Sequence, residues 1–242
     1  MIKKKVIYFI PFLTLVSVLS GVYFGEDSLG GGKHDYNTHL RFLYGFTENF
    51  YDTYKKFGID EEFTKRNSPI LYIFFSLFLK IGFHPESLRI INFLVLVPII
   101  VYFIKCLEIK YPNIDSETKI FFFSALLLSP TIRTLIIWPY PVLWALCFFL
   151  ISIYYYLIFN KTNDLNKKII YAYLNIFFLS LSAYFTPKFA VFSIYFFYNF
   201  FLFYKYKPEI LRIIILNLIF AIPAIYFLIS KDFYLFVNEP FD

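Results

Sequence analysis

A glycine-rich segment near the N-terminus combines a permissive backbone with ionisable side chains. Glycines at positions 30–32 can adopt positive φ and bring the backbone close to a ligand. The next seven residues include one lysine, two histidines and one aspartate, namely Lys33, His34, Asp35 and His39. A carboxylate can serve as a general base, and histidines can orient it or bind a metal. We therefore expect the chemistry of this chain to centre on this segment.

Asp35 has two interpretations that the sequence alone leaves open. It can act as a base that accepts the proton of a substrate hydroxyl. It can equally be the N-cap of the amphipathic helix that follows it. If Asp35 and His39 are both helical, they share one face and could bind a divalent metal; the alternative is a pair of interfacial histidines, His34 and His39, without a ligand.

The composition indicates an integral membrane protein. Hydrophobic residues make up 59% of the 242 residues and charged residues only 17%, with a mean hydropathy of +0.62. Soluble domains have about 45–50% apolar and about 25% charged residues. The net charge of +6 fits lysines and arginines that flank membrane spans, so no nucleic-acid partner is expected. The cysteines, Cys106 and Cys147, have no metal-ligand spacing and are expected to be buried thiols.

The distribution of charge predicts the order and direction of the spans. We expect an all-α, polytopic membrane bundle of about seven spans, at 6–24, 87–104, 120–133, 142–159, 169–186, 189–204 and 210–229. The loops then assigned to the cytoplasm are rich in lysine, whereas the short external turns carry only Arg133 and Lys188. This pattern agrees with the positive-inside rule and places the N-terminus in the cytoplasm.

The first outer loop, residues 25–67, is expected to contain a helix on the membrane surface. Apolar residues recur every three or four positions, at Leu40, Leu43, Phe46, Phe50, Tyr54 and Phe57, and Gly58 is expected to end the helix. Ser68 and Pro69 then open a juxtamembrane helix at 68–82, which is too short to cross a hydrocarbon core of about 30 Å. The loop acids Glu26 and Asp27 are expected to be solvated charges.

Cations and aromatic rings on the predicted outer side are candidates for substrate binding. Phosphate groups bind arginine and lysine, and sugar rings or isoprenoids stack on aromatic side chains. The alternatives are cations that snorkel to the interface and aromatic residues of an interfacial belt. Together with the first loop, this predicts a substrate-binding set of Lys33, His34, His39, Arg66, Arg133, Trp138, Tyr140 and Lys188.

The order of these features resembles the GT-C superfamily of membrane glycosyltransferases, in particular the protein mannosyltransferase and aminoarabinose transferase branch. An early acidic residue in the first outer loop is followed by the segment Arg66–Tyr72, by Ser87-Leu88-Arg89, and by Leu128-Ser129-Pro130 with an arginine after it. The resemblance covers about residues 5–230. It implies a helical bundle with an outward-facing site, a polyprenyl-phosphate sugar donor, Asp35 as the essential acid and Arg66 as a ligand of the lipid phosphate.

The expected function follows from this resemblance. Residues 1–242 would form a single GT-C-like module, either complete or the N-terminal part of a longer protein. It would be an inverting hexosyl- or pentosyltransferase of the bacterial inner membrane, acting in cell-envelope polysaccharide biosynthesis. The acceptor would be a lipid-linked glycan, a glycolipid or a protein. A divalent metal, Mg or Mn, bound by Asp35 and His39 is one option. Two alternatives stay open: a polysaccharide polymerase or flippase, and a non-catalytic membrane module, since 131–141 lacks the second carboxylate of many family members.

Overall fold

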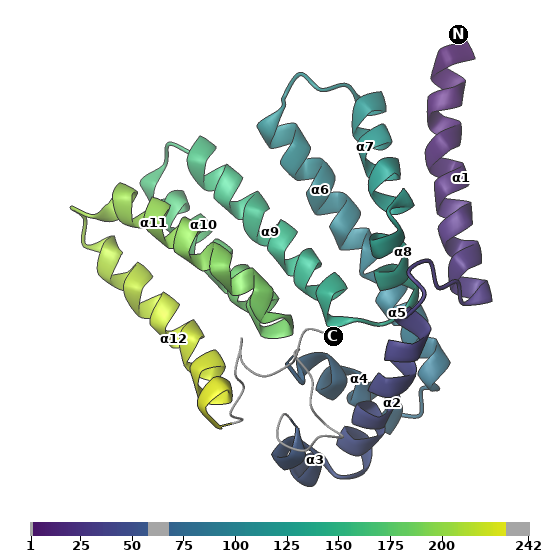
Figure 1. The fold of residues 1–242 in the computed structure, drawn as a ribbon. Helices are drawn as coiled ribbons and strands as arrows, with labels where there is room; N and C mark the ends of the chain where they lie inside the picture. The colour runs from purple at the N-terminus through teal and green to yellow at the C-terminus, as the bar shows by residue number, and fades with distance from the viewer. Residues whose placement is uncertain (1, 58–67, 231–242) are drawn as a thin grey trace, which may run out of the picture.

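The computed structural model describes residues 2–57 and 68–230, and these residues form helices joined by short turns (Figure 1). The all-α class predicted from the sequence is confirmed for this part of the chain. The elements in chain order are α1 (Ile2–Phe24), α2 (Gly32–Glu48), α3 (Phe50–Lys56), α4 (Ile70–Lys80), α5 (Pro85–Leu94), α6 (Leu96–Lys110), α7 (Ser116–Leu128), α8 (Pro130–Ile137), α9 (Pro141–Lys161), α10 (Leu165–Phe185), the 3-10 helix η2 (Pro187–Val191), α11 (Phe192–Tyr204) and α12 (Glu209–Ser230).

The long helices run side by side, and α2, α3 and α4 gather at one end of them (Figure 1). The lysine-rich turns lie at the opposite end. Lys119 Nζ lies 3.0 Å from Glu108 Oε1 and joins the start of α7 to the end of α6. Lys105 Nζ lies 5.4 Å from the centre of the Tyr154 ring and joins the ends of α6 and α9. The turns predicted to share one side of the membrane are therefore neighbours in space.

Fewer helices than predicted are long and apolar enough to cross a membrane. Four segments qualify by length and composition, at 85–110, 141–161, 165–185 and 209–226. A fifth is obtained if α7 and α8, which meet at an angle of 73°, are one broken span. The seven-span count is therefore not confirmed. In α1 the apolar stretch among the described side chains is residues 9–24, and α11 has only 13 residues because η2 precedes it.

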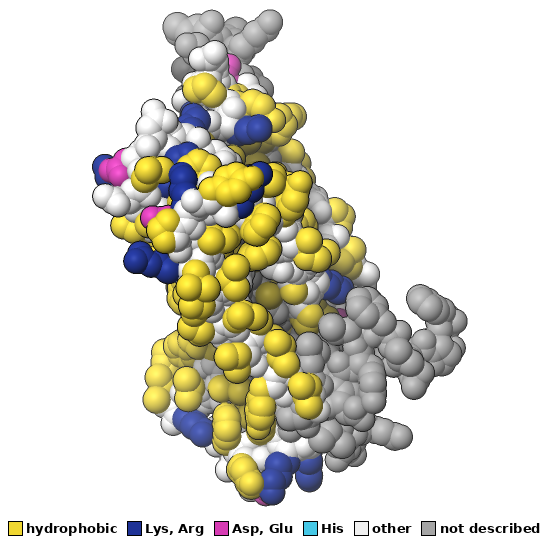
Figure 2. Space-filling view, turned by 90° about the vertical axis from the view of Figure 1, so that its left-hand side faces the viewer, with side chains coloured by type: hydrophobic (Ala, Val, Ile, Leu, Met, Phe, Trp, Pro, Cys, Tyr) yellow, Lys and Arg dark blue, Asp and Glu magenta, His cyan; other side chains and the backbone are white. Residues whose placement is uncertain are grey.

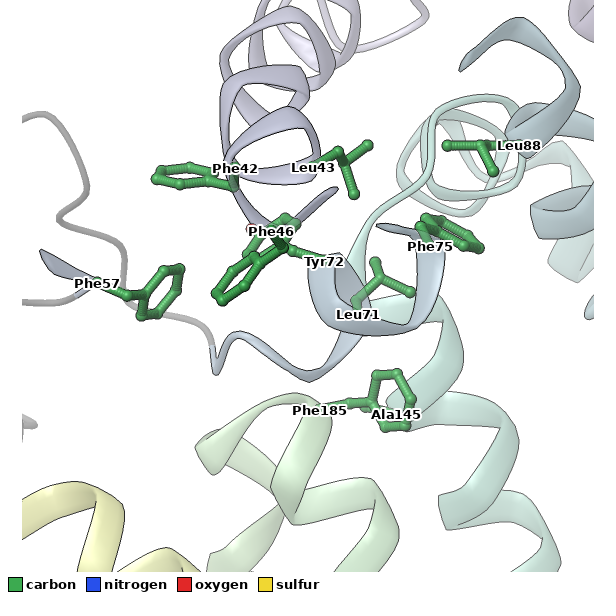
Figure 3. Packing of buried hydrophobic residues seen from close by; sticks show 10 residues of the cluster. All are labelled: Phe42, Leu43, Phe46, Phe57, Leu71, Tyr72, Phe75, Leu88, Ala145 and Phe185. Carbon is green, nitrogen blue, oxygen red and sulfur yellow. The ribbon is translucent and has the colours of Figure 1, made fainter. Parts of the chain in front are cut away.

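The predicted surface helix is divided in two and packs against protein. Asn49 ends α2, and its side chain accepts a hydrogen bond of 3.2 Å from the Asp52 amide at the start of α3. Phe42, Leu43 and Phe46 on α2 pack against Leu71 and other residues of α4 (Figure 3). Phe50, expected in the same stripe, is 46% exposed because the break at Asn49 turns it away. Gly58, the expected end, lies outside the described residues.

The three helices α2, α3 and α4, here called the end module, are continuous with the core of the bundle. Ala145 of α9 and Phe185 of α10 belong to the same cluster as the α4 residues Leu71 and Phe75 (Figure 3). The Ser68 hydroxyl accepts a hydrogen bond of 3.3 Å from the Ile70 amide, as a residue capping α4 would. With 11 residues, α4 spans about 16 Å, roughly half of a hydrocarbon core.

Polar side chains join neighbouring helices inside the bundle. The fully buried Asn92 amide of α5 donates to the carbonyl oxygens of Leu135 and Ile136, both at 2.9 Å. Asn175 of α10 donates to the carbonyl of Ser152 on α9 at 2.8 Å. Asn92 and Asn175 therefore join neighbouring helices, whereas Asn199 and Asn217 each donate to a carbonyl of their own helix. Asn92 also satisfies carbonyls at the end of α8 that have no partner within that helix.

Candidate functional site

The glycine-rich segment leads directly into α2, and the residue that caps this helix is Asp27. Its carboxylate accepts hydrogen bonds from the amides of Gly32, at 2.9 Å, and Lys33, at 3.2 Å. Burial alone would raise the pKa of Asp27, but the bonds from these amides, together with those of Gly31 and Gly30, outweigh it and hold the pKa below its ordinary value. The prediction that Asp27 is a solvated loop charge is wrong.

The three glycines of this segment have different local environments. Gly30 has a φ of +75°, in the left-handed region that favours glycine. A Cβ atom on Gly31 would meet nothing within 4 Å. A Cβ atom on Gly32 would lie 2.5 Å from Thr134 Cγ2 and 2.8 Å from Trp138 Cδ1. The close approach allowed by Gly32 is therefore to the protein itself, at the contact of α2 with α8.

Asp35 lies in the first turn of α2 and is half-buried at the edge of a pocket of about 200 Å³. Within the described residues, the Asp35 carboxylate forms no hydrogen bond or ion pair. The alternative interpretation of Asp35 as the N-cap is wrong, because Asp35 lies inside the first turn of α2, Gly31 is at the N-cap position, and the first amides donate to Asp27. The pocket is lined by Leu29, Gly31, Gly32, Asp35, Thr134, Leu135, Trp138 and Tyr140.

Trp138 forms one wall of the pocket and is fixed on several sides. Its indole Nε1 donates to the Glu26 carbonyl at 2.9 Å. The Arg89 guanidinium lies 4.3 Å from the centre of the Trp138 ring, and Arg89 also donates to the carbonyl oxygens of Val22 and Ile137. Trp138 is only 5% exposed, so most of its side chain is covered by protein. Arg89 thus ties together the ends of α1 and α8.

Arg133 lies beneath this pocket wall and pairs with Glu26. Its Nε donates to Glu26 Oε1 at 3.1 Å, its Nη2 forms an ion pair with Glu26 Oε2, and its Nη1 donates to Ser17 Oγ at 3.0 Å. The hydrogen bond from Arg133, assisted by one from Ser28, lowers the pKa of Glu26. Glu26 is therefore not the solvated charge that the sequence predicted, and the charge of Arg133 is balanced within the chain.

His39 is buried one turn after Asp35 on α2. It is 2% exposed, and its ring centre lies 5.1 Å from that of Tyr72 and 5.3 Å from that of Tyr140. Among the residues that the structure describes, no three His, Cys, Asp or Glu side chains gather in a way that could hold a metal. Mg²⁺ and Mn²⁺ prefer several oxygen ligands, so the described donor pair of Asp35 and His39 does not fit either ion.

The remaining predicted site residues are distributed around the pocket. Tyr140 lines it, beside Trp138. Lys33 and His34 are exposed at the start of α2, next to the pocket mouth. Lys188 is exposed on η2 and is not among the lining residues. Arg66 lies outside the described residues.

Thr134 is the pocket residue that sequence reasoning missed. It lines the pocket from α8, and its hydroxyl oxygen is buried without a hydrogen-bond partner in the described part of the chain. A single threonine in an apolar helix gives no chemical signal by itself. The spacing of Arg133, Thr134 and Trp138 along one short helix becomes informative only once α8 is known to face α2.

Comparisons with known proteins do not identify a family. No protein-family model matches the sequence, and neither does any curated protein or solved structure. The pocket and its neighbours are therefore the basis on which a function can be assigned.

Proposed function

We propose that this chain is a membrane glycosyltransferase that moves a sugar from a polyprenyl-phosphate donor to an acceptor hydroxyl, with Asp35 as the general base. The observation that supports this most directly is the state of three neighbouring acids. Glu26 is paired with Arg133 and Asp27 caps α2, whereas Asp35 lines a pocket without a hydrogen bond or ion pair in the described residues. A base must be free to take a proton, and Asp35 meets this requirement.

The proposed reaction is a single displacement at the anomeric carbon. The acceptor oxygen forms the new bond to this carbon while its proton passes to the Asp35 carboxylate. The bond from the anomeric carbon to the phosphate oxygen breaks, and its electron pair leaves with the polyprenyl phosphate. Attack from the face opposite to the leaving group inverts the anomeric configuration. No metal takes part in these steps.

The surroundings of Asp35 suit a hydroxylated substrate attached to a lipid. Trp138 and Tyr140 provide aromatic faces for a sugar ring, and Thr134 adds a hydroxyl group from α8. The pocket lies where the end module meets the bundle, close to the ends of the apolar helices, so an isoprenoid chain can remain in the membrane while its sugar reaches Asp35. Lys33, Arg66 and Lys188 are the proposed partners of the donor phosphate.

The proposal includes a sidedness for the membrane. We propose that the end module faces outward from a bacterial inner membrane and that the N-terminus and the lysine-rich turns are cytoplasmic. The positive-inside rule supports this orientation for the short turns: those joining α6 to α7, α9 to α10 and α11 to α12 have lysines in or beside them and lie at the end opposite to the end module (Figure 1). In this arrangement the four long segments, the broken span of α7 and α8, and the helices α1 and α11 would together cross the membrane seven times.

A non-catalytic membrane module is the second candidate, and one observation favours it. The described residues that line the pocket include no lysine, arginine or histidine, and Arg133 is already paired with Glu26. The negative charge of a lipid phosphate bound in the pocket would therefore have to be balanced by cations that do not line the pocket. In this case the pocket would bind a partner or a neutral glycan without transferring it.

Replacement of Asp35 by asparagine tests the enzymatic proposal. The purified protein in lipid vesicles is given a panel of radiolabelled polyprenyl-phosphate hexoses and pentoses with a glycolipid acceptor. We expect Asp35→Asn to lower the transfer rate by about 10²–10⁴-fold, the usual contribution of a general base. The unfolding midpoint should fall only slightly, because Asp35 forms no ion pair or hydrogen bond in the described residues and loses only the weak attraction of its charge to the start of α2.

Glu48→Gln is the matched control, since Glu48 is an exposed acid at the far end of the same helix. It should transfer sugar at the wild-type rate. Equal rates for Asp35→Asn and Glu48→Gln would remove Asp35 as the base. Failure of the wild-type protein with every donor, together with retained binding of the acceptor glycan, would favour the non-catalytic module.

A further inference from the structure

Two lysines meet over one aromatic ring at the end of the bundle opposite to the pocket. Lys168 Nζ, from the first turns of α10, lies 4.3 Å from the centre of the Phe203 ring. Lys207 Nζ, from the turn before α12, lies 4.2 Å from the same centre. Each contacts a second ring as well, Lys168 that of Phe159 at 5.2 Å and Lys207 that of Tyr204 at 5.5 Å. Three helix ends therefore bring two ammonium groups together.

The charge of this lysine pair is not balanced within the described chain. Neither Lys168 nor Lys207 forms an ion pair there, although both side chains are half-buried. In the described residues, neither of the two nearest acids in the sequence forms an ion pair with Lys168 or Lys207. Asp164 caps α10 and lies 3.9 Å from Lys167, and Glu209 lies beside Tyr204 without a partner for its Oε2 atom. Both ammonium groups lie within 4.3 Å of one ring centre, so two positive charges share one small region, and an anion beside the Phe203 ring would be attracted by both.

The position of the pair indicates the kind of anion. Apolar side chains cover the middle of this face of the molecule, and lysines and arginines gather towards its ends (Figure 2). Close to the pair, Tyr206 is 89% exposed and Leu165 is 56% exposed, as expected for residues that contact lipid at the edge of a membrane. A phospholipid is the phosphate source that fits this position, because its acyl chains can lie along the apolar face.

We propose that Lys168 and Lys207, held over the ring of Phe203, form a binding site for the phosphate of an anionic phospholipid headgroup. Aromatic rings beneath the two ammonium groups fix them by cation–π contact and keep them at the membrane interface. This site is separate from the Asp35 pocket and does not depend on the proposed transferase activity.

Lipid selectivity measured by electron paramagnetic resonance tests this proposal. The full chain is reconstituted in phosphatidylcholine vesicles that contain spin-labelled phosphatidylglycerol or spin-labelled phosphatidylcholine. We expect the wild-type protein to prefer phosphatidylglycerol, and the Lys168→Gln/Lys207→Gln double variant to lose on the order of tenfold of this preference, given the usual contribution of two basic residues at an anionic surface. Lys168→Arg/Lys207→Arg should retain it.

The matched control removes two other lysines from the same end of the bundle. Lys110→Gln/Lys161→Gln changes the net charge equally, and both side chains are exposed. Equal losses in the two glutamine double variants would show diffuse surface attraction and overturn the site, as would a wild-type protein without preference. If the glutamine variant does not fold, Phe203→Leu keeps both charges and should still reduce the preference. Displacement of the labelled lipid by millimolar inorganic phosphate would overturn the assignment to a lipid.

Discussion

Three acidic residues within ten positions differ in what surrounds them. Glu26 accepts hydrogen bonds from Arg133, and Asp27 accepts them from backbone amides at the start of α2. Asp35 has neither kind of partner in the described residues. The first two acids have lowered pKa values and stabilise the fold in their charged forms. Of the three, only the Asp35 carboxylate makes no structural contact of this kind among the described residues.

The Glu26–Arg133 pair makes stability depend on pH. The pKa of Glu26 in the folded protein lies below its ordinary value of 4.5. Its contribution is therefore complete above about pH 4.5 and is lost as the pH falls through the lower, folded-state pKa. We expect the unfolding midpoint of the wild-type protein to fall more steeply below pH 4.5 than that of Glu26→Gln.

The same variant should be less stable at neutral pH. Glu26→Gln is expected to cost about 1–2 kcal/mol, less than a fully buried pair would, because the Glu26 side chain is 35% exposed. Thermal unfolding in detergent, followed by tryptophan fluorescence at neutral and acidic pH, measures both effects. Identical pH profiles for the two proteins would show that the pair does not stabilise the fold.

The position of Asp35 near a helix start could be predicted from the sequence, but the roles of Glu26 and Asp27 could not. Asp27 caps a helix that begins five residues later, and the intervening glycine turn has no standard spacing. Glu26 and Arg133 are 107 positions apart, and nothing local indicates that they meet. Arg66, the predicted phosphate ligand, lies outside the described residues and stays a prediction.

Among the elements, the contact of α2 with α8 determines the shape of the pocket. Gly32 lies against Thr134 and Trp138, so the start of α2 can approach α8 closely. Arg89 and Asn92 of α5 hold the carbonyl end of α8 in place. The pocket therefore depends on how short helices pack. Hydrophobic periodicity predicted that helices exist here, but not where α2 would break or which helix it would face.

Substitution of Gly32 tests the importance of this contact. Gly32→Ala would place a methyl group 2.5 Å from Thr134 Cγ2, which forces α2 away from α8. We expect a loss of about 1–3 kcal/mol in the free energy of unfolding, typical of overpacking. Gly31→Ala adds the same methyl group where nothing lies within 4 Å and is the matched control. Unfolding in denaturant compares them; equal stability of the two variants would contradict the close packing.

At the scale of the whole molecule, the two ends of the bundle differ in chemistry. The end module contributes Asp35 to a pocket, and within the described residues this carboxylate has no hydrogen bond or ion pair, whereas at the other end Lys168 and Lys207 share one aromatic ring. Between them the surface is apolar; on α12, for example, Leu211, Leu218 and Ile222 are each about 60% exposed. This surface is compatible with an integral membrane protein. Composition alone predicted this class, but helix lengths in the structure support only four or five of the seven expected spans.

Labelling of single cysteines tests which helices cross. Lys161 and Lys188 are exposed at opposite ends of the 21-residue helix α10, about 31 Å long. We expect a membrane-impermeant maleimide to label Lys188→Cys in intact cells and Lys161→Cys only after permeabilisation. The parent protein is the control, since Cys106 and Cys147 are both buried. Labelling of both positions from the same side would show that α10 does not cross.

The pocket has one wall from residues 29–35 and another from residues 134–140. Because translation proceeds from the N-terminus, the residues of the first wall are synthesised about a hundred residues before those of the second. During synthesis, Asp35 and its neighbours on α2 therefore stay uncovered until α8 and Trp138 have been synthesised and have packed against them. Chains that stop before residue 140 should lack the pocket altogether, and mistakes in the biogenesis of this protein should concentrate at that moment of late closure.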